Sequence, residues 1–175
     1  VSVLVMTGEE ANAVIVGEGG LAENMSPGGT IVLTSTIKPA EARAIATGLD
    51  GTGLLLIDSP VSGGYPGAQG GTLTLMAAAP ENILSNARPV LEAISADIHH
   101  VGTQPGEGQV VKACLQSLIG SIFSATFEAA ALAAKAGVPG QVILDVFSTS
   151  SAGSGITNNA VQKIIDRQFE GTGSH

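Results

Sequence analysis

Short apolar runs bounded by turn residues alternate with helically spaced segments along the first hundred residues. The aliphatic and β-branched runs predict four strands, at 1–6, 30–34, 54–57 and 73–77. Helical spacing lies between them at 9–16 and at 39–48, where a proline stands in the first turn and a glycine ends the pattern. Because the run at 54–57 is apolar at every position, it fits a strand covered on both faces. The alternation predicts an α/β fold with a parallel sheet and helices on its faces.

The pattern changes after Gly102. A turn-rich segment, 103–108, leads into 28 positions without proline, 109–136, which would form a helix about 42 Å long. Gly137 and Pro139 end this helix, and further helices are predicted at 140–147 and 156–169. We therefore place a boundary near residue 105, with an α/β part at 1–105 and an all-α part at 106–175.

The long apolar helix has the length of a membrane span, because 110–134 is mostly apolar. Lys112, Gln116 and Glu128 lie within it. A charged side chain near the centre of a bilayer costs about 2.5–3.5 kcal/mol. A helix buried between protein neighbours explains the same apolarity without that cost. We therefore expect no membrane partner.

Composition and charge narrow the function classes. The chain is 44% hydrophobic and 13% charged, the opposite of a disordered acidic tail. Its formal net charge of −8 would repel the phosphates of nucleic acid, so no nucleic-acid partner is expected. Cys114 is the single cysteine and lies in an apolar run. A reduced compartment, the cytoplasm or an organelle matrix, is the simplest interpretation.

One pattern suggests a dinucleotide loop and another suggests a metal site, but both are explained by ordinary secondary structure. Residues 17–22 match G-x-G-x-x-A, but only a short helical segment, 21–25, follows before Ser26-Pro-Gly-Gly29 breaks the chain. A dinucleotide loop requires a longer helix and a later acidic residue, so a turn is favoured. His99 and His100 would point to opposite faces of a strand, which argues against a shared metal ion. We expect no metal site.

A glycine-rich segment after the third predicted strand is a candidate anion site. The strand ends at Asp58, Pro60 keeps the preceding residue extended, and Ser62, Gly63 and Gly64 then offer successive N–H groups. Ligands of open α/β sheets gather outside the carboxyl ends of the strands, where this loop would lie. A turn that merely reverses the chain remains an equal alternative on this segment alone.

Lys112 is the only charged residue between Gly108 and Phe127. It stands four positions before Gln116, so the two side chains share one helix face. Desolvation in apolar surroundings should lower the pKa of Lys112 and suit it to proton transfer near neutral pH. A lysine that snorkels from the helix start to solvent is the alternative.

Together the two motifs resemble the β-hydroxyacid dehydrogenases, a family related to 6-phosphogluconate dehydrogenase that includes 3-hydroxyisobutyrate dehydrogenase and tartronate semialdehyde reductase. The resemblance covers essentially the whole chain. The family's substrate motif, D-x-P-V-S-G-G-x-x-x-A-x-x-G-T-L, is matched at Asp58, 60–64, Ala68 and 71–73. Its catalytic motif, G-x-G-x-x-x-K-x-x-N-N, is matched at Gly106, Gly108 and Lys112, whereas Leu115 and Gln116 replace the two asparagines.

The resemblance implies an oxidoreductase that transfers a hydride between NAD or NADP and a small β-hydroxyacid or its semialdehyde. In this family Lys112 would be the general acid/base. The substrate carboxylate would bind at Ser62, Gly63 and Gly64. The substrate hydroxyl would bind at Gln116, which resembles the branch that handles larger sugar acids such as threonate. Cofactor contacts would fall on Val5, Met6 and Ser35.

The resemblance also implies that both domains are partial: 1–105 would belong to a Rossmann-like NAD(P)-binding domain and 106–175 to a helical substrate and dimerisation domain. The family's N-terminal G-x-G-x-x-G loop and its acidic ribose partner are not among these residues. We therefore expect a fragment that is inactive by itself and binds NAD poorly. The family pairs its subunits through the helical domain, so a homo-oligomer is expected. The alternative is a catalytically silent helical assembly module.

Overall fold

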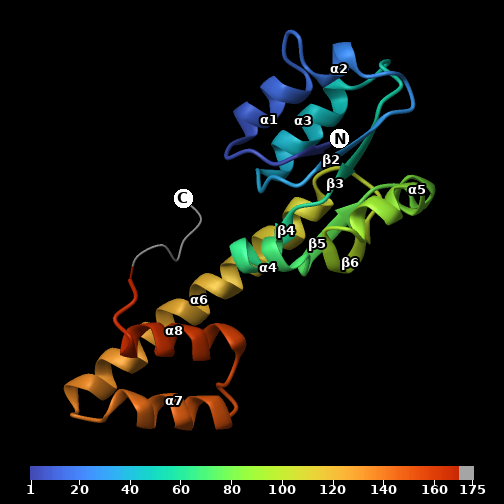
Figure 1. Cartoon of the computed structure of the whole chain (residues 1–175). Coiled ribbons are helices and arrows are strands. Elements are labelled where there is room, and N and C mark those ends of the chain that lie inside the picture. Colours follow the sequence, from blue (N-terminus) through green and yellow to red (C-terminus); the bar gives the residue numbers. More distant parts are fainter. Residues whose placement is uncertain (170–175) are drawn as a thin grey trace. The chain divides into compact units, whose positions relative to one another are not determined.

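The structure is a computed structural model that describes residues 1–169 (Figure 1). It consists of two units, Val1–Cys114 and a second that begins at Leu115. The division therefore falls inside the longest helix, α6 (Glu107–Lys135). Residues 170–175, with which the predicted helical domain closes, lie outside the described residues.

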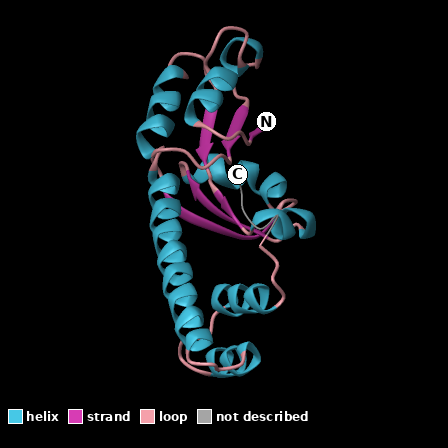
Figure 2. Ribbon diagram, turned by 90° about the vertical axis from the view of Figure 1, so that its left-hand side faces the viewer, coloured by secondary structure: helices cyan, strands magenta, loops and turns pink. Residues whose placement is uncertain are grey.

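The first unit contains a six-stranded mixed sheet, drawn in magenta in Figure 2. Its strands are β1 (Ser2–Val3), β2 (Thr30–Leu33), β3 (Leu55–Asp58), β4 (Val61–Ser62), β5 (Leu73–Ala78) and β6 (Ser95–Gly102). β1, β2 and β3 are parallel neighbours in that order. A strand is present at each of the four predicted positions, although β1 is much shorter than the predicted 1–6, and the parallel arrangement of the first three is confirmed.

The fourth predicted strand, β5, departs from the parallel arrangement. It runs antiparallel to β3 and β4 and parallel to β6. Only the short helix α4 (Gly64–Gly70) lies between β4 and β5. A parallel pair needs a crossover of a dozen or more residues, whereas a short connection suits antiparallel strands. The sheet therefore has a parallel part, formed by β1, β2 and β3, and a mixed part, in which β5 has both antiparallel and parallel neighbours.

Helices cover both faces of the sheet in this unit. Side chains alternate along β2, so Ile31 and Leu33 belong to one core cluster and Val32 to the other. The first cluster contains residues of α1 (Gly8–Ile15) and α3 (Pro39–Gly48), with α2 (Leu21–Asn24) at its margin. The second contains residues of α5 (Glu81–Leu91), a helix that was not predicted because Pro89 interrupts its pattern.

The second unit is helical. It contains the greater part of α6, followed by α7 (Gly140–Thr149) and α8 (Gly155–Ile165), which pack against each other. The predicted helices are confirmed to within a few residues. The second unit is therefore all-α and begins within a long helix, which agrees with the predicted fold class.

The apolar surface of α6 is largely uncovered in the described chain. By length and composition α6 is the one helix within residues 1–169 that could cross a membrane; its 18-residue window has a mean hydropathy of 1.4 and is 6% buried. A single helix of this kind is weak support for a membrane span. The expectation that protein neighbours bury this helix is not met by the described residues. Exposed apolar side chains include Leu118, Phe123, Phe127 and Leu132.

Candidate active site

The loop between β3 and α4 is shaped by two glycines. Gly63 has a φ of 126° and Gly64 a φ of 57°, backbone conformations that residues other than glycine rarely adopt. A Cβ atom at Gly63 would also lie 3.2 Å from Cδ2 of Leu73. The backbone conformation therefore favours glycine at position 63, and a larger residue would also displace the Leu73 side chain slightly.

The three residues that were predicted to bind a carboxylate are consecutive at this edge of the sheet. Ser62 is half-buried and pairs with Thr74 of β5, while Gly63 and Gly64 are exposed. Gly63 precedes the first residue of α4, and the first N–H groups of a helix have no partner within it. Successive N–H groups of this kind can bind a carboxylate.

A buried carboxylate connects this loop to the start of α6. Asp58, the last residue of β3, is fully buried. Its Oδ2 accepts hydrogen bonds from the N–H groups of Gly106 (2.8 Å) and Gln109 (3.4 Å), and its Oδ1 accepts one from Nε2 of Gln109 (2.7 Å). Burial raises the pKa of Asp58, while these donors act in the opposite direction. The carboxylate therefore caps the N-terminus of α6 from a distant strand.

The side-chain amide of Gln109 extends this network to the end of β2. Gln109 is 1% exposed. Its Nε2 also donates to the carbonyl oxygen of Ser35 (3.0 Å), and its Oε1 accepts from the N–H of Ile37 (3.0 Å). Neither Gln109 nor Asp58 was predicted to have this role. The sequence signals that could have indicated this role were the acidic Asp58 at the end of an apolar strand and the amide of Gln109 early in an apolar helix.

The backbone at the start of α6 lies directly on the sheet. A Cβ atom at Gly108 would lie 2.6 Å from the carbonyl oxygen of Met76, 2.8 Å from that of Asp58 and 2.9 Å from Cδ of Pro60. Real Cβ atoms do not approach backbone this closely, so any side chain here would move the helix. Gly108 therefore brings α6 against the same strand ends that carry the glycine loop.

Lys112 lies three positions after Gln109 on α6, in the first unit. It is 7% exposed. Burial lowers the pKa of Lys112, in the direction that the sequence predicted. Gln116 follows one helical turn later, where it is exposed and already part of the second unit. The helix thus presents an amine and an amide on one face.

The predicted cofactor residues meet beyond the carboxyl ends of β1 and β2. The N–H of Val5 donates to Oγ of Ser35 (2.8 Å), and Ser35 is fully buried, whereas Met6 is 64% exposed. Val5 and Met6 can therefore offer carbonyl oxygens and apolar surface to a dinucleotide, while the hydroxyl of Ser35 holds the N–H of Val5. This position at a sheet edge fits part of a dinucleotide site.

The start of α1 does not fit the pyrophosphate of such a cofactor. Thr7 caps this helix by accepting from the N–H of Glu10 (3.1 Å). The carboxylate of Glu10 accepts in turn from the N–H groups of Met6 (2.8 Å) and Thr7 (3.1 Å). These donors are already used, and a second anion would meet a negative charge.

The glycine pattern at 17–22 is a turn, as interpreted from the sequence. The preceding residues up to Ile15 belong to α1 rather than to a strand, and the helix that follows, α2, has four residues. The N–H of Gly19 donates to Oε2 of Glu23 (3.0 Å). The pattern therefore lacks the strand and the long helix that phosphate binding requires.

The two adjacent histidines lie in β6. Nε2 of His100 lies 2.9 Å from the carbonyl oxygen of Ala79, and its Nδ1 lies 2.9 Å from Oε2 of Glu81. Within residues 1–169 no group of three or more His, Cys, Asp or Glu side chains is arranged to hold a metal ion. The imidazole of His100 thus pairs with the start of α5.

Comparison with known families defines the class of protein. Residues 1–102 match the NAD binding domain of 6-phosphogluconate dehydrogenase. Residues 106–174 match the family described as NAD-binding of NADP-dependent 3-hydroxyisobutyrate dehydrogenase. The chain therefore belongs to this family of NAD-binding dehydrogenase domains, and its resemblance to the β-hydroxyacid dehydrogenases is confirmed.

Individual relatives agree with this assignment. The chain is 38% identical to an L-threonate dehydrogenase of Escherichia coli O6:H1, with 95% of this chain and 55% of that protein covered. It is 37% identical to a 3-hydroxyisobutyrate dehydrogenase of Pseudomonas aeruginosa, with 86% and 50% covered. The crystal structure of 3-hydroxyisobutyrate dehydrogenase from Salmonella typhimurium matches with a TM-score of 0.85 at 35% identity, with 95% and 57% covered. The chain spans about half the length of the curated relatives it matches.

Proposed function

We propose that the full-length protein is an NAD- or NADP-dependent dehydrogenase of small hydroxyacids and that Lys112 is its general acid/base. The observation that carries this proposal is the buried position of Lys112, where burial lowers its pKa. The start of its helix, α6, is bonded to Asp58 at the end of β3, four residues before Ser62. Buried lysines with lowered pKa values are suited to proton transfer near neutral pH.

In the proposed chemistry the glycine loop binds the substrate and α6 supplies the group that accepts the proton. The N–H groups at Ser62, Gly63 and Gly64 bind the substrate carboxylate and fix the orientation of the neighbouring carbinol. A nicotinamide cofactor, contacted by Val5 and Met6, would supply the acceptor for the hydride that leaves the carbinol carbon. The hydroxyl proton passes to the neutral amine of Lys112, which becomes an ammonium group. The product is the carbonyl acid, and in the reverse direction Lys112 returns the proton.

We propose a sugar acid such as L-threonate as the substrate class. Gln116 would donate its amide hydrogen to the substrate hydroxyl from the same helix face as Lys112. The names of the relatives, L-threonate and 3-hydroxyisobutyrate dehydrogenases, support a hydroxyacid of this size. Val5 and Met6 would contact the cofactor, and Ser35 would support Val5 through its hydroxyl.

A direct assay tests this function. The full-length protein is incubated with NAD or NADP and with L-threonate, 3-hydroxyisobutyrate or a non-acidic alcohol of similar size, and the reduced cofactor is followed by absorbance. Reduction with at least one hydroxyacid and none with the alcohol is expected. No reduction with any hydroxyacid would contradict the proposal and would favour the silent assembly module.

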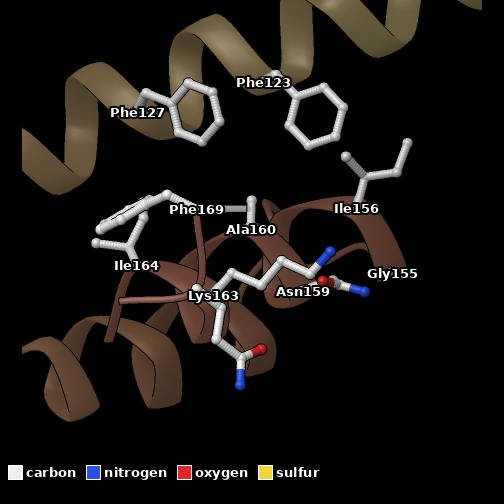
Figure 3. Close-up of a pocket in the computed structure, with 10 residues that line it drawn as sticks. Phe123, Phe127, Gly155, Ile156, Asn159, Ala160, Lys163, Ile164 and Phe169 are labelled. Carbon is white, nitrogen blue, oxygen red and sulfur yellow. The ribbon is translucent and has the colours of Figure 1, made fainter. Parts of the chain in front are cut away.

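We further propose that a second copy of the chain covers the apolar face of the helical unit. Figure 3 shows Phe123 and Phe127 of α6 facing Ile156 and Ala160 of α8. These residues line a cavity of about 710 Å³. Exposed apolar patches of this kind mark interaction surfaces, and soluble homo-oligomers commonly pair identical surfaces. Sedimentation of the full-length protein should give a dimer or higher oligomer that Phe127→Glu weakens, because Phe127 lines this cavity and is 49% exposed. A monomer at all concentrations would contradict this.

A further inference from the structure

One buried junction connects the two elements that carry the proposed site. Asp58 precedes Ser62 by four residues, and Gln109 precedes Lys112 by three. The carboxylate of Asp58 and the amide of Gln109 are joined at 2.7 Å, and both side chains are buried. The junction therefore lies within one turn of the amine on the helix side and a few residues from the glycine loop on the strand side.

Both amide hydrogens and the amide oxygen of Gln109 have a hydrogen-bond partner. Its two amide hydrogens go to Asp58 and to the carbonyl oxygen of Ser35, and its oxygen accepts from Ile37. Glutamate could not replace it, because a carboxylate would face both the carboxylate of Asp58 and the carbonyl of Ser35. An apolar residue would take one hydrogen bond away from each of three buried atoms: Oδ1 of Asp58, the carbonyl oxygen of Ser35 and the N–H of Ile37. The chemistry at position 109 is therefore specific for glutamine.

The junction also fixes where α6 begins. Three backbone and side-chain donors of the helix start converge on one carboxylate, and Gly108 allows the backbone to lie against Asp58 and Pro60. A shift of α6 along its axis would break all of these contacts together. Because a helix is stiff over one turn, the register at Gln109 sets the position of Lys112.

We infer that Asp58 and Gln109 are positioning residues that set the position of the Lys112 amine relative to the glycine loop. This inference rests on the proposed function of Lys112. Neither residue needs to touch the substrate, because Asp58 is 0% and Gln109 1% exposed. A displacement of about 1 Å in a reacting group can lower a rate about 100-fold, so the junction would affect turnover more than cofactor binding.

A double-variant kinetic cycle tests the inference in the full-length protein, with NAD and L-threonate as the probe pair, or the hydroxyacid of highest kcat/KM if another is preferred. Gln109→Met should lower kcat about 10- to 100-fold with little change in KM for the cofactor. Lys112→Ala should lower kcat at least as far. The combination should be no slower than Lys112→Ala alone, because a residue that acts only through the amine has no effect once the amine is gone.

A small primary amine added to the assay gives a second readout in the Lys112→Ala variant and in the double variant. An untethered amine does not depend on the register of α6, so any rescue should be the same whether or not the Gln109→Met substitution is present. Gln162→Met, at an exposed position on α8, is the matched control and should leave kcat unchanged. If Gln109→Met fails to fold, Asp58→Asn, which keeps the shape of the side chain, replaces it in the cycle.

The outcomes separate this inference from the function on which it rests. An inactive protein, or an active one that Lys112→Ala does not slow, refutes the proposed function. A strong Lys112→Ala effect with unchanged kcat in both Gln109→Met and Asp58→Asn overturns the inference alone. Effects that multiply in the double variant also overturn it, because they would show that the junction acts independently of the lysine.

Discussion

The Oδ1 atom of Asp58 accepts a hydrogen bond of 2.7 Å from Nε2 of Gln109, across 51 positions of sequence and with both side chains buried. This bond joins the end of β3 to the first turn of α6. It places the negatively charged carboxylate of Asp58 at the positive end of the α6 dipole, and this stabilises the carboxylate and the helix. The position of the proposed general base thus depends on a contact between two polar residues.

Removing the amide should destabilise the protein. Gln109→Ala removes one buried hydrogen bond each from the N–H of Ile37, the carbonyl oxygen of Ser35 and the Oδ1 atom of Asp58. Each unsatisfied group costs about 1–3 kcal/mol, so we expect the free energy of unfolding to fall by at least about 2 kcal/mol. Urea unfolding measures it. Gln162→Ala, which removes an exposed glutamine, should change it by less than about 0.5 kcal/mol. Equal effects of the two variants would argue against the junction.

The glycine loop should resist even a small side chain. Gly63→Ala forces a φ of 126° on alanine and brings its Cβ to 3.2 Å from Leu73. Residues in such conformations cost about 1–3 kcal/mol, and KM for the hydroxyacid should rise because the N–H groups move. Gly120→Ala in α6, where a Cβ meets nothing within 4 Å, should instead be neutral or slightly stabilising. Thermal unfolding and steady-state kinetics test both. An unaltered KM in Gly63→Ala would count against carboxylate binding there.

The stability of the protein should depend on pH through Lys112. Burial lowers the pKa of its ammonium below the ordinary value of 10.5. Between the two values the unfolded chain binds more protons than the folded one, so the free energy of unfolding increases as pH rises through this interval. Lys112→Met should lack that increase, and Lys135→Met, at an exposed position, should keep it. Urea unfolding at several alkaline pH values tests this; parallel curves for the wild type and Lys112→Met would contradict it.

The length of the amide at position 116 should influence substrate choice. Gln116→Asn shortens the side chain by one methylene, a change that alters discrimination about 10-fold or more in fitted sites. We expect kcat/KM for L-threonate to fall relative to that for 3-hydroxyisobutyrate. Gln141→Asn on α7 is the matched control and should leave the ratio unchanged. A constant ratio in Gln116→Asn would remove this residue from substrate recognition.

Local patterns were sufficient to predict most elements of the fold. The apolar runs of β2 and β3 and the proline and glycine that bound α3 act within a few residues, so they can be interpreted without knowledge of the remaining chain. The orientation of β5 could not be predicted in this way, because it depends on the short connection through α4 and on pairing with β4. α5 was missed because Pro89 lies inside it.

In the candidate site, too, features set by neighbouring residues were predictable and features set by long-range contacts were not. Lys112 was noticeable as a lone charge in an apolar helix, and the glycines of the loop formed a recognisable motif. The Asp58–Gln109 bond was not predictable, since it joins residues 51 positions apart and each is unremarkable in its own segment. Long-range polar pairs carry no local periodicity. The burial of Ser35, which was predicted as a direct cofactor contact, also became visible only in three dimensions.

The central claim is that Lys112 transfers the substrate proton, and turnover of Lys112→Ala tests it most directly. The full-length variant is assayed with NAD or NADP and its preferred hydroxyacid, beside Lys135→Ala and with circular dichroism to verify folding. We predict that kcat falls at least about 100-fold for Lys112→Ala, as the loss of a general base implies, while Lys135→Ala retains wild-type turnover. Wild-type turnover in a folded Lys112→Ala protein would contradict the account.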